Sequence, residues 1–131
     1  MTSSAGPKSD VSDRNVVSVL VVEDAWHVAK AMKAVLEQLG MQVVGPTATT
    51  AEARRLVAEM HPRMAIVDVN LKREMASDLI DELHGQGVRV IVVSGYAAPP
   101  VSKESVAAFL QKPFSGAELI TTVSAVVRTL H

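Results

Sequence analysis

Short runs of aliphatic residues alternate with amphipathic segments along this chain, and the alternation limits the folds that it can adopt. The runs 16–22, 64–69 and 88–94 are almost continuously apolar and rich in β-branched residues, as strands buried on both faces are. Two shorter runs, 41–45 and 107–111, have the same character. Such strands fit a parallel sheet with helices packed on both faces, which requires a helix between consecutive strands.

Helical periodicity fills the segments between these runs. Apolar residues recur at spacings of three and four in four segments: 25–39, 49–60, 76–83 and 115–130. This spacing predicts amphipathic helices with one face on a core. Within the second and the last of these segments, Thr49 with Glu52 and Ser115 with Glu118 have the spacing of capping boxes. A further segment, 102–107, is weakly patterned and predicts only a short helix. We therefore predict one α/β domain of five strand–helix units.

Size, charge and composition exclude several classes of protein. A chain of 131 residues builds one core, and we place this domain at residues 16–131. The chain has no cysteine, which excludes disulfides and thiolate metal sites. Its net charge of −1, without a basic block, argues against direct nucleic-acid binding. No apolar run approaches the ~18 residues of a membrane span, and the polar segment 1–15 lacks a signal-peptide core, so we expect a flexible tail on a cytoplasmic protein.

Polar side chains stand where the predicted strands end. Glu23 and Asp24 follow the first strand, and Asp68 ends the third strand between two valines. Ser94 ends the fourth strand, and Lys112 follows the fifth. The carboxyl ends of parallel strands share one edge of the sheet, where ligands bind. We therefore expect these side chains to lie close together.

This combination of side chains suits phosphoryl transfer assisted by a metal ion. Carboxylates brought together repel one another unless a cation joins them, and oxygen ligands without histidine or cysteine favour Mg²⁺ over Zn²⁺. Asp68 stands alone at the centre of the edge, so it is the better candidate for a nucleophile that forms an acyl phosphate. Lys112 and Ser94 would then neutralise and hydrogen-bond the transferred oxygens.

Four motifs at these strand ends together resemble the receiver domain of bacterial two-component response regulators. The motifs are VLVVEDAW, AIVDVNL, VIVVSGY and FLQKPF, and the resemblance extends from about Val16 to Leu130. It implies a flavodoxin-like, doubly wound (βα)5 sheet with the strand order 2-1-3-4-5. The NLxxE pattern at residues 70–74 and the Gly-Tyr after Ser94 look loosely like a stand-alone receiver branch of alphaproteobacteria, in which the fourth helix is short or mobile.

The resemblance also implies a role for each residue of the site. Asp68 would accept the phosphoryl group. Glu23, Asp24 and Asp68 would bind Mg²⁺, with the backbone carbonyl of Asn70 as a further ligand. Lys112 would pair with the phosphoryl oxygens or with Asp68.

Further positions would transmit or tune the signal. Ser94 would move toward the phosphoryl group, and Phe109, where the family often has tyrosine, would change rotamer. Asn70 and Tyr96 lie two residues beyond the phosphoacceptor and the switch hydroxyl, so the resemblance gives them control of water access. We expect the bulky Tyr96 to slow hydrolysis. The resemblance also implies a cis peptide bond before Pro113.

These expectations describe a response regulator that is phosphorylated by a histidine kinase or a phosphotransfer protein and acts on a separate downstream protein. We do not expect a turnover enzyme. One alternative is a Mg²⁺-dependent phosphohydrolase with Asp68 as nucleophile, although Asn70 stands where such enzymes commonly carry a second acid. Another is an interaction module that works without phosphorylation, which predicts an incomplete site.

Several of these side chains also have a purely structural interpretation. Glu23 and Asp24 would suit the first turn of the next helix, and Lys112 alone would be a solvated surface residue. An acid amid buried strand residues is harder to explain without a function. We expect Trp26 and Phe109 to pack locally.

Overall fold

Five parallel strands form one sheet in the computed structural model, which describes residues 16–95 and 101–130. The strands are β1 (Ser18–Val22), β2 (Gln42–Thr47), β3 (Met64–Asp68), β6 (Arg89–Ser94) and β7 (Ala108–Gln111). Their order across the sheet is β2-β1-β3-β6-β7. Counted by the strands of this sheet alone, that is 2-1-3-4-5, so the predicted fold class and strand order are confirmed. The predicted tail over 1–15 lies outside the described residues.

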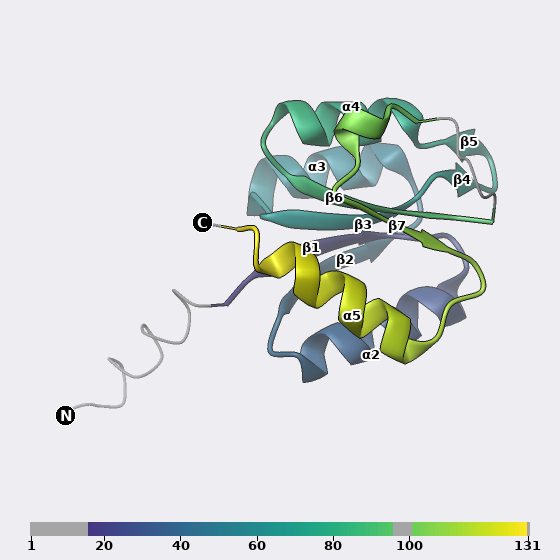
Figure 1. Ribbon diagram of the computed structural model, residues 1–131. Coiled ribbons are helices and arrows are strands. Elements are labelled where there is room, and N and C mark those ends of the chain that lie inside the picture. The colour runs from purple at the N-terminus through teal and green to yellow at the C-terminus, as the bar shows by residue number, and fades with distance from the viewer. Residues whose placement is uncertain (1–15, 96–100, 131) are drawn as a thin grey trace.

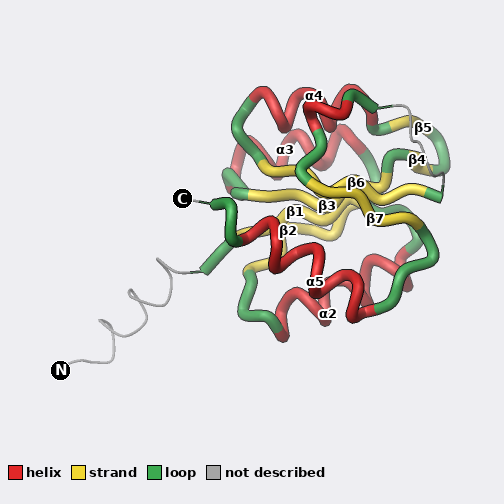
Figure 2. The backbone as a smooth tube through the Cα atoms, viewed as in Figure 1, coloured by secondary structure: helices red, strands yellow, loops and turns green. Residues whose placement is uncertain are grey.

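Helices cover both faces of the sheet. One face carries α2 (Trp26–Gln38) and α5 (Gly116–Val127). The other face carries α3 (Thr50–Met60), α4 (Ser77–Gly85) and the 3₁₀ turn η1 (Lys103–Ser105). The sheet therefore forms a central layer between two helical layers (Figures 1 and 2).

Successive residues of β1 enter different hydrophobic cores. Val19 and Val21 pack with residues of α2 and α5, whereas Leu20 and Val22 pack with residues of α3 and α4. All four side chains are fully buried. Burial of an aliphatic side chain of this size stabilises a fold by about 1.5–3 kcal/mol, which explains why the strand is apolar from Val19 to Val22.

The two predicted capping boxes differ in the structure. At the start of α5 the box is complete: the Ser115 hydroxyl accepts from the Glu118 N–H at 3.1 Å, and the Glu118 carboxylate accepts from the Ser115 N–H at 2.9 Å. At α3 the Thr49 hydroxyl accepts from the Glu52 N–H at 3.2 Å. The Glu52 side chain pairs instead with Arg55, so the prediction of a reciprocal box there is wrong.

Three elements differ from the sequence-based prediction. The loop after Asp68 contains a hairpin, β4 (Asn70–Leu71) and β5 (Glu74–Met75), which is too short to show a sequence period. Strand β2 extends beyond the predicted end at residue 45 to Thr47, with a cis bond between Gly45 and Pro46. The fourth helix, predicted over 102–107, is only the three-residue 3₁₀ turn η1.

Two large apolar side chains are more exposed than the helical pattern predicts. Leu39 is 40% exposed and Met60 is 47% exposed, because both lie at the ends of their helices, beyond the sheet that covers the inward stripe. Trp26 begins α2 and is 72% exposed, and it packs locally as expected, edge to face with His27 at 6.4 Å between the ring centroids. The ammonium nitrogen of Lys30 lies 5.8 Å from the centroid of the Trp26 ring.

Gly45→Ala is expected to destabilise the fold by about 2–3 kcal/mol. Gly45 has a φ of +92°, and an added Cβ would lie 2.9 Å from Thr47 N and 3.2 Å from Val21 O. Gly87→Ala is the matched control, because its φ is +84° but a Cβ there meets nothing within 4 Å. Urea unfolding should show a clearly larger loss for Gly45→Ala. Equal losses would mean that the close contacts add nothing to the backbone strain.

Candidate metal centre

The carboxyl ends of β1, β3 and β7 bring two buried acids and one lysine together. Glu23 is 2% exposed and Asp68 is 5% exposed, at the ends of the two central strands. Lys112 follows β7, and its Nζ lies 2.8 Å from Asp68 Oδ2 and 3.0 Å from Glu23 Oε1. A buried carboxylate is costly without a counter-charge, and here one ammonium serves two of them.

A third acid completes a cluster that fits a divalent cation. Carboxylate oxygens of Glu23, Asp24 and Asp68 lie within 4.8 Å of one another, and Asp24 is partly exposed to solvent. Lys112 balances only one of the three negative charges. Oxygen ligands in this number, with an open side toward water, suit Mg²⁺, which binds through a few carboxylates and keeps several waters.

Backbone amides orient all three carboxylates. The Ala25 N–H donates to Glu23 Oε2 at 3.0 Å, and the Asn70 N–H donates to Asp68 Oδ1 at 3.0 Å. The Lys72 N–H donates to Asp24 Oδ2. Each acid therefore uses one oxygen for a backbone amide. The other oxygen of Glu23 and that of Asp68 face Lys112. These contacts hold the three carboxylates in position without a cation, as groups around a metal site commonly do.

The site changes the pKa values of two of its members. Burial raises the pKa of Glu23, and repulsion from Asp68 adds to this, against the hydrogen bond from Ala25 and the attraction of Lys112. Burial acts to lower the pKa of Lys112, but hydrogen bonds to Asp68 and Glu23 outweigh it, so its pKa lies above the usual value. The lysine therefore stays charged at neutral pH, whereas ionisation of Glu23 costs free energy in the folded protein.

Glu23→Gln is expected to stabilise the metal-free protein more at pH 7 than at pH 4. Because the folded-state pKa of Glu23 is raised, its favourable contribution is complete below the unfolded pKa and is lost as the pH rises through the folded pKa. Glutamine removes that pH-dependent loss. Urea unfolding in EDTA at both pH values measures the difference. A gain that is larger at pH 4 would contradict the raised pKa.

The predicted switch residues lie on the two strands at one side of Asp68. Ser94 is fully buried at the end of β6, and its carbonyl accepts the Lys112 N–H at 2.7 Å. Phe109, on β7, is 36% exposed, which is more than the expectation of local packing implies. It belongs to the edge strand β7, and in the described part of the chain no further strand pairs with the outer edge of β7. Tyr96 lies outside the described residues, and the peptide bond before Pro113 is cis.

Sequence reasoning missed the contributors that act through the backbone. The amides of Ala25 and Lys72 orient Glu23 and Asp24, but a backbone amide leaves no mark in residue type. Only a strand-end acid followed by a tight turn would have indicated them.

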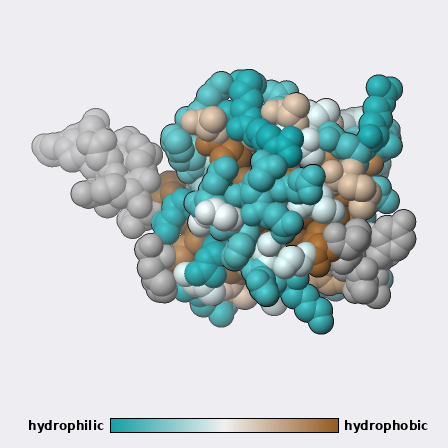
Figure 3. All heavy atoms as spheres, turned by 90° about the horizontal axis from the view of Figure 1, so that it is seen from above, coloured by the Kyte–Doolittle hydropathy of each residue, from teal (hydrophilic) through white to brown (hydrophobic). Residues whose placement is uncertain are grey.

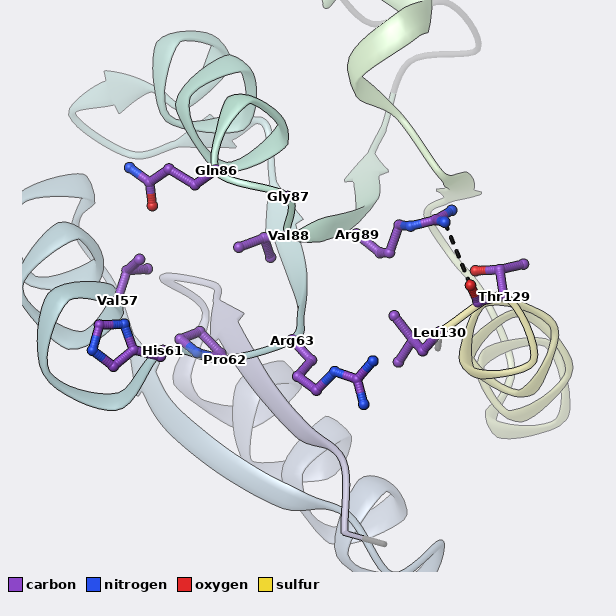
Figure 4. Close-up of a pocket in the computed structure, with 10 residues that line it drawn as sticks. All are labelled: Val57, His61, Pro62, Arg63, Gln86, Gly87, Val88, Arg89, Thr129 and Leu130. Carbon is purple, nitrogen blue, oxygen red and sulfur yellow. Dashed lines mark hydrogen bonds between the residues drawn. The ribbon is translucent and has the colours of Figure 1, made fainter. Parts of the chain in front are cut away.

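A separate cavity lies at the amino-terminal ends of strands β3 and β6, on the side of the sheet opposite to the acidic cluster. It measures about 510 Å³, and Arg63 and Arg89 line it together with residues at the ends of α3, α4 and α5 (Figure 4). One guanidinium nitrogen of Arg89 donates to the carbonyl of Thr129 at 3.4 Å. Cations are favourable beside helix carboxyl ends, which explains the position of Arg89 without a ligand. The face with α3 and α4 is largely hydrophilic, with small hydrophobic areas between (Figure 3).

Comparison with known proteins points to one family. The family model of the response regulator receiver domain matches residues 19–124. Among curated proteins, the transcriptional regulatory protein PdtaR of Mycobacterium tuberculosis is 27% identical over 128 residues. That match covers 93% of this chain and 62% of PdtaR, so the chain spans less than two thirds of this relative.

Solved structures agree with this fold. A CheY-like receiver domain protein of Methanospirillum hungatei has a TM-score of 0.79 at 22% identity, over 88% of this chain and 96% of the other. The receiver domain of PhyR from Erythrobacter litoralis has a TM-score of 0.78 at 23% identity, over 91% and 95% of the two chains. PhyR of Brucella abortus has a TM-score of 0.75 at 24% identity, over 87% of this chain and 49% of PhyR.

Within the described residues, no helix is long and apolar enough to cross a membrane.

Proposed function

Because this chain belongs to the response regulator receiver domain family, we propose that it accepts a phosphoryl group on Asp68 and changes its partner-binding surface in response. The observation that carries the proposal is the position of Asp68. Its carboxylate lies between two acids that can share a cation with it and a lysine 2.8 Å away. Members of this family are generally not turnover enzymes, and we propose no turnover reaction for this chain.

The donor in this proposal is a phosphohistidine of a histidine kinase or phosphotransfer protein. A carboxylate oxygen of Asp68 attacks the phosphorus, the P–N bond breaks, and its electron pair remains on the imidazole nitrogen. Glu23, Asp24, Asp68 and the Asn70 carbonyl would hold Mg²⁺, which would neutralise the charge on the transferred oxygens. Lys112 contributes the second positive charge, as its Nζ already contacts Asp68.

Lys112 and Ser94 would transmit the new charge to the surface. Phosphorylation gives the lysine a more strongly charged partner, and Lys112 N–H is bonded to the Ser94 carbonyl at 2.7 Å. A shift of this pair would move the ends of β6 and β7, where Phe109 is already partly exposed. A partner that binds one of the two arrangements better would be recruited by phosphorylation. Asn70 and Tyr96 would control water access to the acyl phosphate.

Two alternatives make different predictions. A Mg²⁺-dependent phosphohydrolase would need an acid/base group, and the position two residues after Asp68 is Asn70. An interaction module that works without phosphorylation would not need a lysine beside two acids, Glu23 and Asp68, that are buried at a cost in free energy.

Incubation with acetyl phosphate and Mg²⁺ tests the proposal. Intact-mass measurement should show one added phosphoryl group per chain, which hydroxylamine removes, and EDTA should prevent the addition. Rapid release of phosphate from a generic phosphomonoester, without a labelled protein, would support the hydrolase instead. No label and no NMR shift at Ser94 or Phe109 with beryllofluoride would support the passive module.

A further inference from the structure

The hairpin of β4 and β5 contacts the acidic cluster through its first strand, β4, and through the turn that follows that strand. The Asn70 N–H donates to Asp68 Oδ1 at 3.0 Å, and the Lys72 N–H donates to Asp24 Oδ2. These two amides belong to the segment that directly follows the candidate phosphoacceptor. The orientation of both acids therefore depends on where the hairpin lies.

The second strand of the hairpin is fastened to α3 by Glu74. Its Oε1 accepts the Thr50 hydroxyl at 2.6 Å, and its Oε2 accepts the Thr50 N–H at 3.0 Å. Thr50 is the first residue of α3, where backbone N–H groups lack helical partners and a negative charge is favourable. Glu74 comes from 24 residues further along the chain, so this contact is tertiary.

The two attachments are close neighbours through the hairpin itself. Leu71 pairs directly with Glu74 across the two strands, and Lys72 is the next residue after Leu71. Leu71 is 3% exposed and belongs to the core under α3 and α4. A displacement of Glu74 therefore changes the position of the amide that Asp24 accepts.

We propose that Glu74 is a positioning residue for the metal centre. By holding the hairpin on Thr50, it keeps the Lys72 amide on one oxygen of Asp24, so that the other oxygen is presented to the cation. Groups that orient metal ligands in this way commonly change metal affinity by 10–100-fold when removed. The inference rests on the proposed Mg²⁺ site, but the anchor itself exists in the metal-free protein.

The decisive variant is Thr50→Val, because it removes a hydrogen bond to Glu74 without changing the charge. We expect it to weaken Mg²⁺ binding about tenfold in an NMR titration. Glu74→Gln should weaken it at least as much, since an amide accepts only one of the two bonds. The double variant should bind Mg²⁺ no more weakly than Glu74→Gln alone, because both substitutions break the same anchor.

Two controls separate the anchor from general effects. Glu59→Gln is the control for Glu74→Gln: it removes one negative charge from α3, where Glu59 pairs with Arg55 at 2.9 Å. Thr121→Val is the control for Thr50→Val, because it makes the same replacement at an exposed position of α5. Both should bind Mg²⁺ within about twofold of the parent. A loss in Glu59→Gln equal to that in Glu74→Gln would reduce the effect to charge and overturn the proposal.

A second measurement needs no metal. Hydrogen exchange of the Lys72 amide in the metal-free protein should be about tenfold faster in Thr50→Val and Glu74→Gln, because the hairpin would open locally more often. Unchanged exchange, or faster exchange with unchanged Mg²⁺ affinity, would overturn the positioning role. A parent protein that binds no Mg²⁺ would instead refute the proposed metal site, and the exchange result would still decide whether Glu74 holds the hairpin.

Discussion

Asp68→Asn is expected to reduce phosphoryl uptake from acetyl phosphate to background. An amide oxygen is a poor nucleophile and cannot form the acyl phosphate, whereas the rest of the site keeps its shape. The Asn70 N–H, which now donates to Asp68 Oδ1 at 3.0 Å, can still donate to the amide oxygen. Lys112 keeps Glu23 as a partner at 3.0 Å. Loss of labelling in this variant would therefore report lost chemistry rather than lost folding.

Asp78→Asn is the matched control for that loss. Asp78 is exposed in the first turn of α4, away from the three clustered acids, and this variant should be labelled like the parent. Circular dichroism and urea unfolding should show that both variants remain folded. Undiminished labelling of Asp68→Asn would refute the assignment of the phosphoacceptor and direct attention to the other carboxylates of the cluster.

The fold could be predicted because hydrophobic burial leaves a strong periodic signal in this chain. The fully buried run of β1 and the inward stripe of α3 show it directly, since each position serves a known face of the sheet. The ends of elements were less predictable. Leu39 and Met60 continue the helical period past the edge of the sheet, where there is no core to bury them.

The candidate site was predictable to the extent that it depends on side-chain chemistry. Parallel strands must bring their carboxyl ends to one edge, so strand-end residues such as Asp68 and Lys112 were expected to meet. The support around them was not predictable. The Lys72 amide and the bond between Glu74 and Thr50 depend on a two-residue hairpin pairing, which leaves no period in the sequence.

Lys112→Met is expected to destabilise the metal-free protein by about 2 kcal/mol. The ammonium is the cation beside both Glu23 and Asp68, and removing one partner of a buried pair typically costs 3–5 kcal/mol. The smaller value reflects the 29% exposure of the Lys112 side chain, which lets water screen the acids. Methionine retains the apolar length of the stem, so the change isolates the charge. Lys103→Met, on the exposed turn η1, should change stability little.

Mg²⁺ should remove most of the deficit of Lys112→Met. The variant leaves the acids more negative, so a divalent cation binds more tightly and stabilises the folded state by mass action, about 2.7 kcal/mol at a hundredfold excess over Kd. The raised pKa of Lys112 adds a second signature. The stabilisation that the charged Lys112 gives the parent protein is complete below the usual pKa of 10.5 and is lost as the pH rises through the folded-state pKa. In EDTA, the stabilities of parent and variant should therefore converge at alkaline pH. Urea unfolding with EDTA or Mg²⁺ measures both effects, and a deficit independent of Mg²⁺ and pH would mean that Lys112 stabilises the fold by packing rather than by its charge.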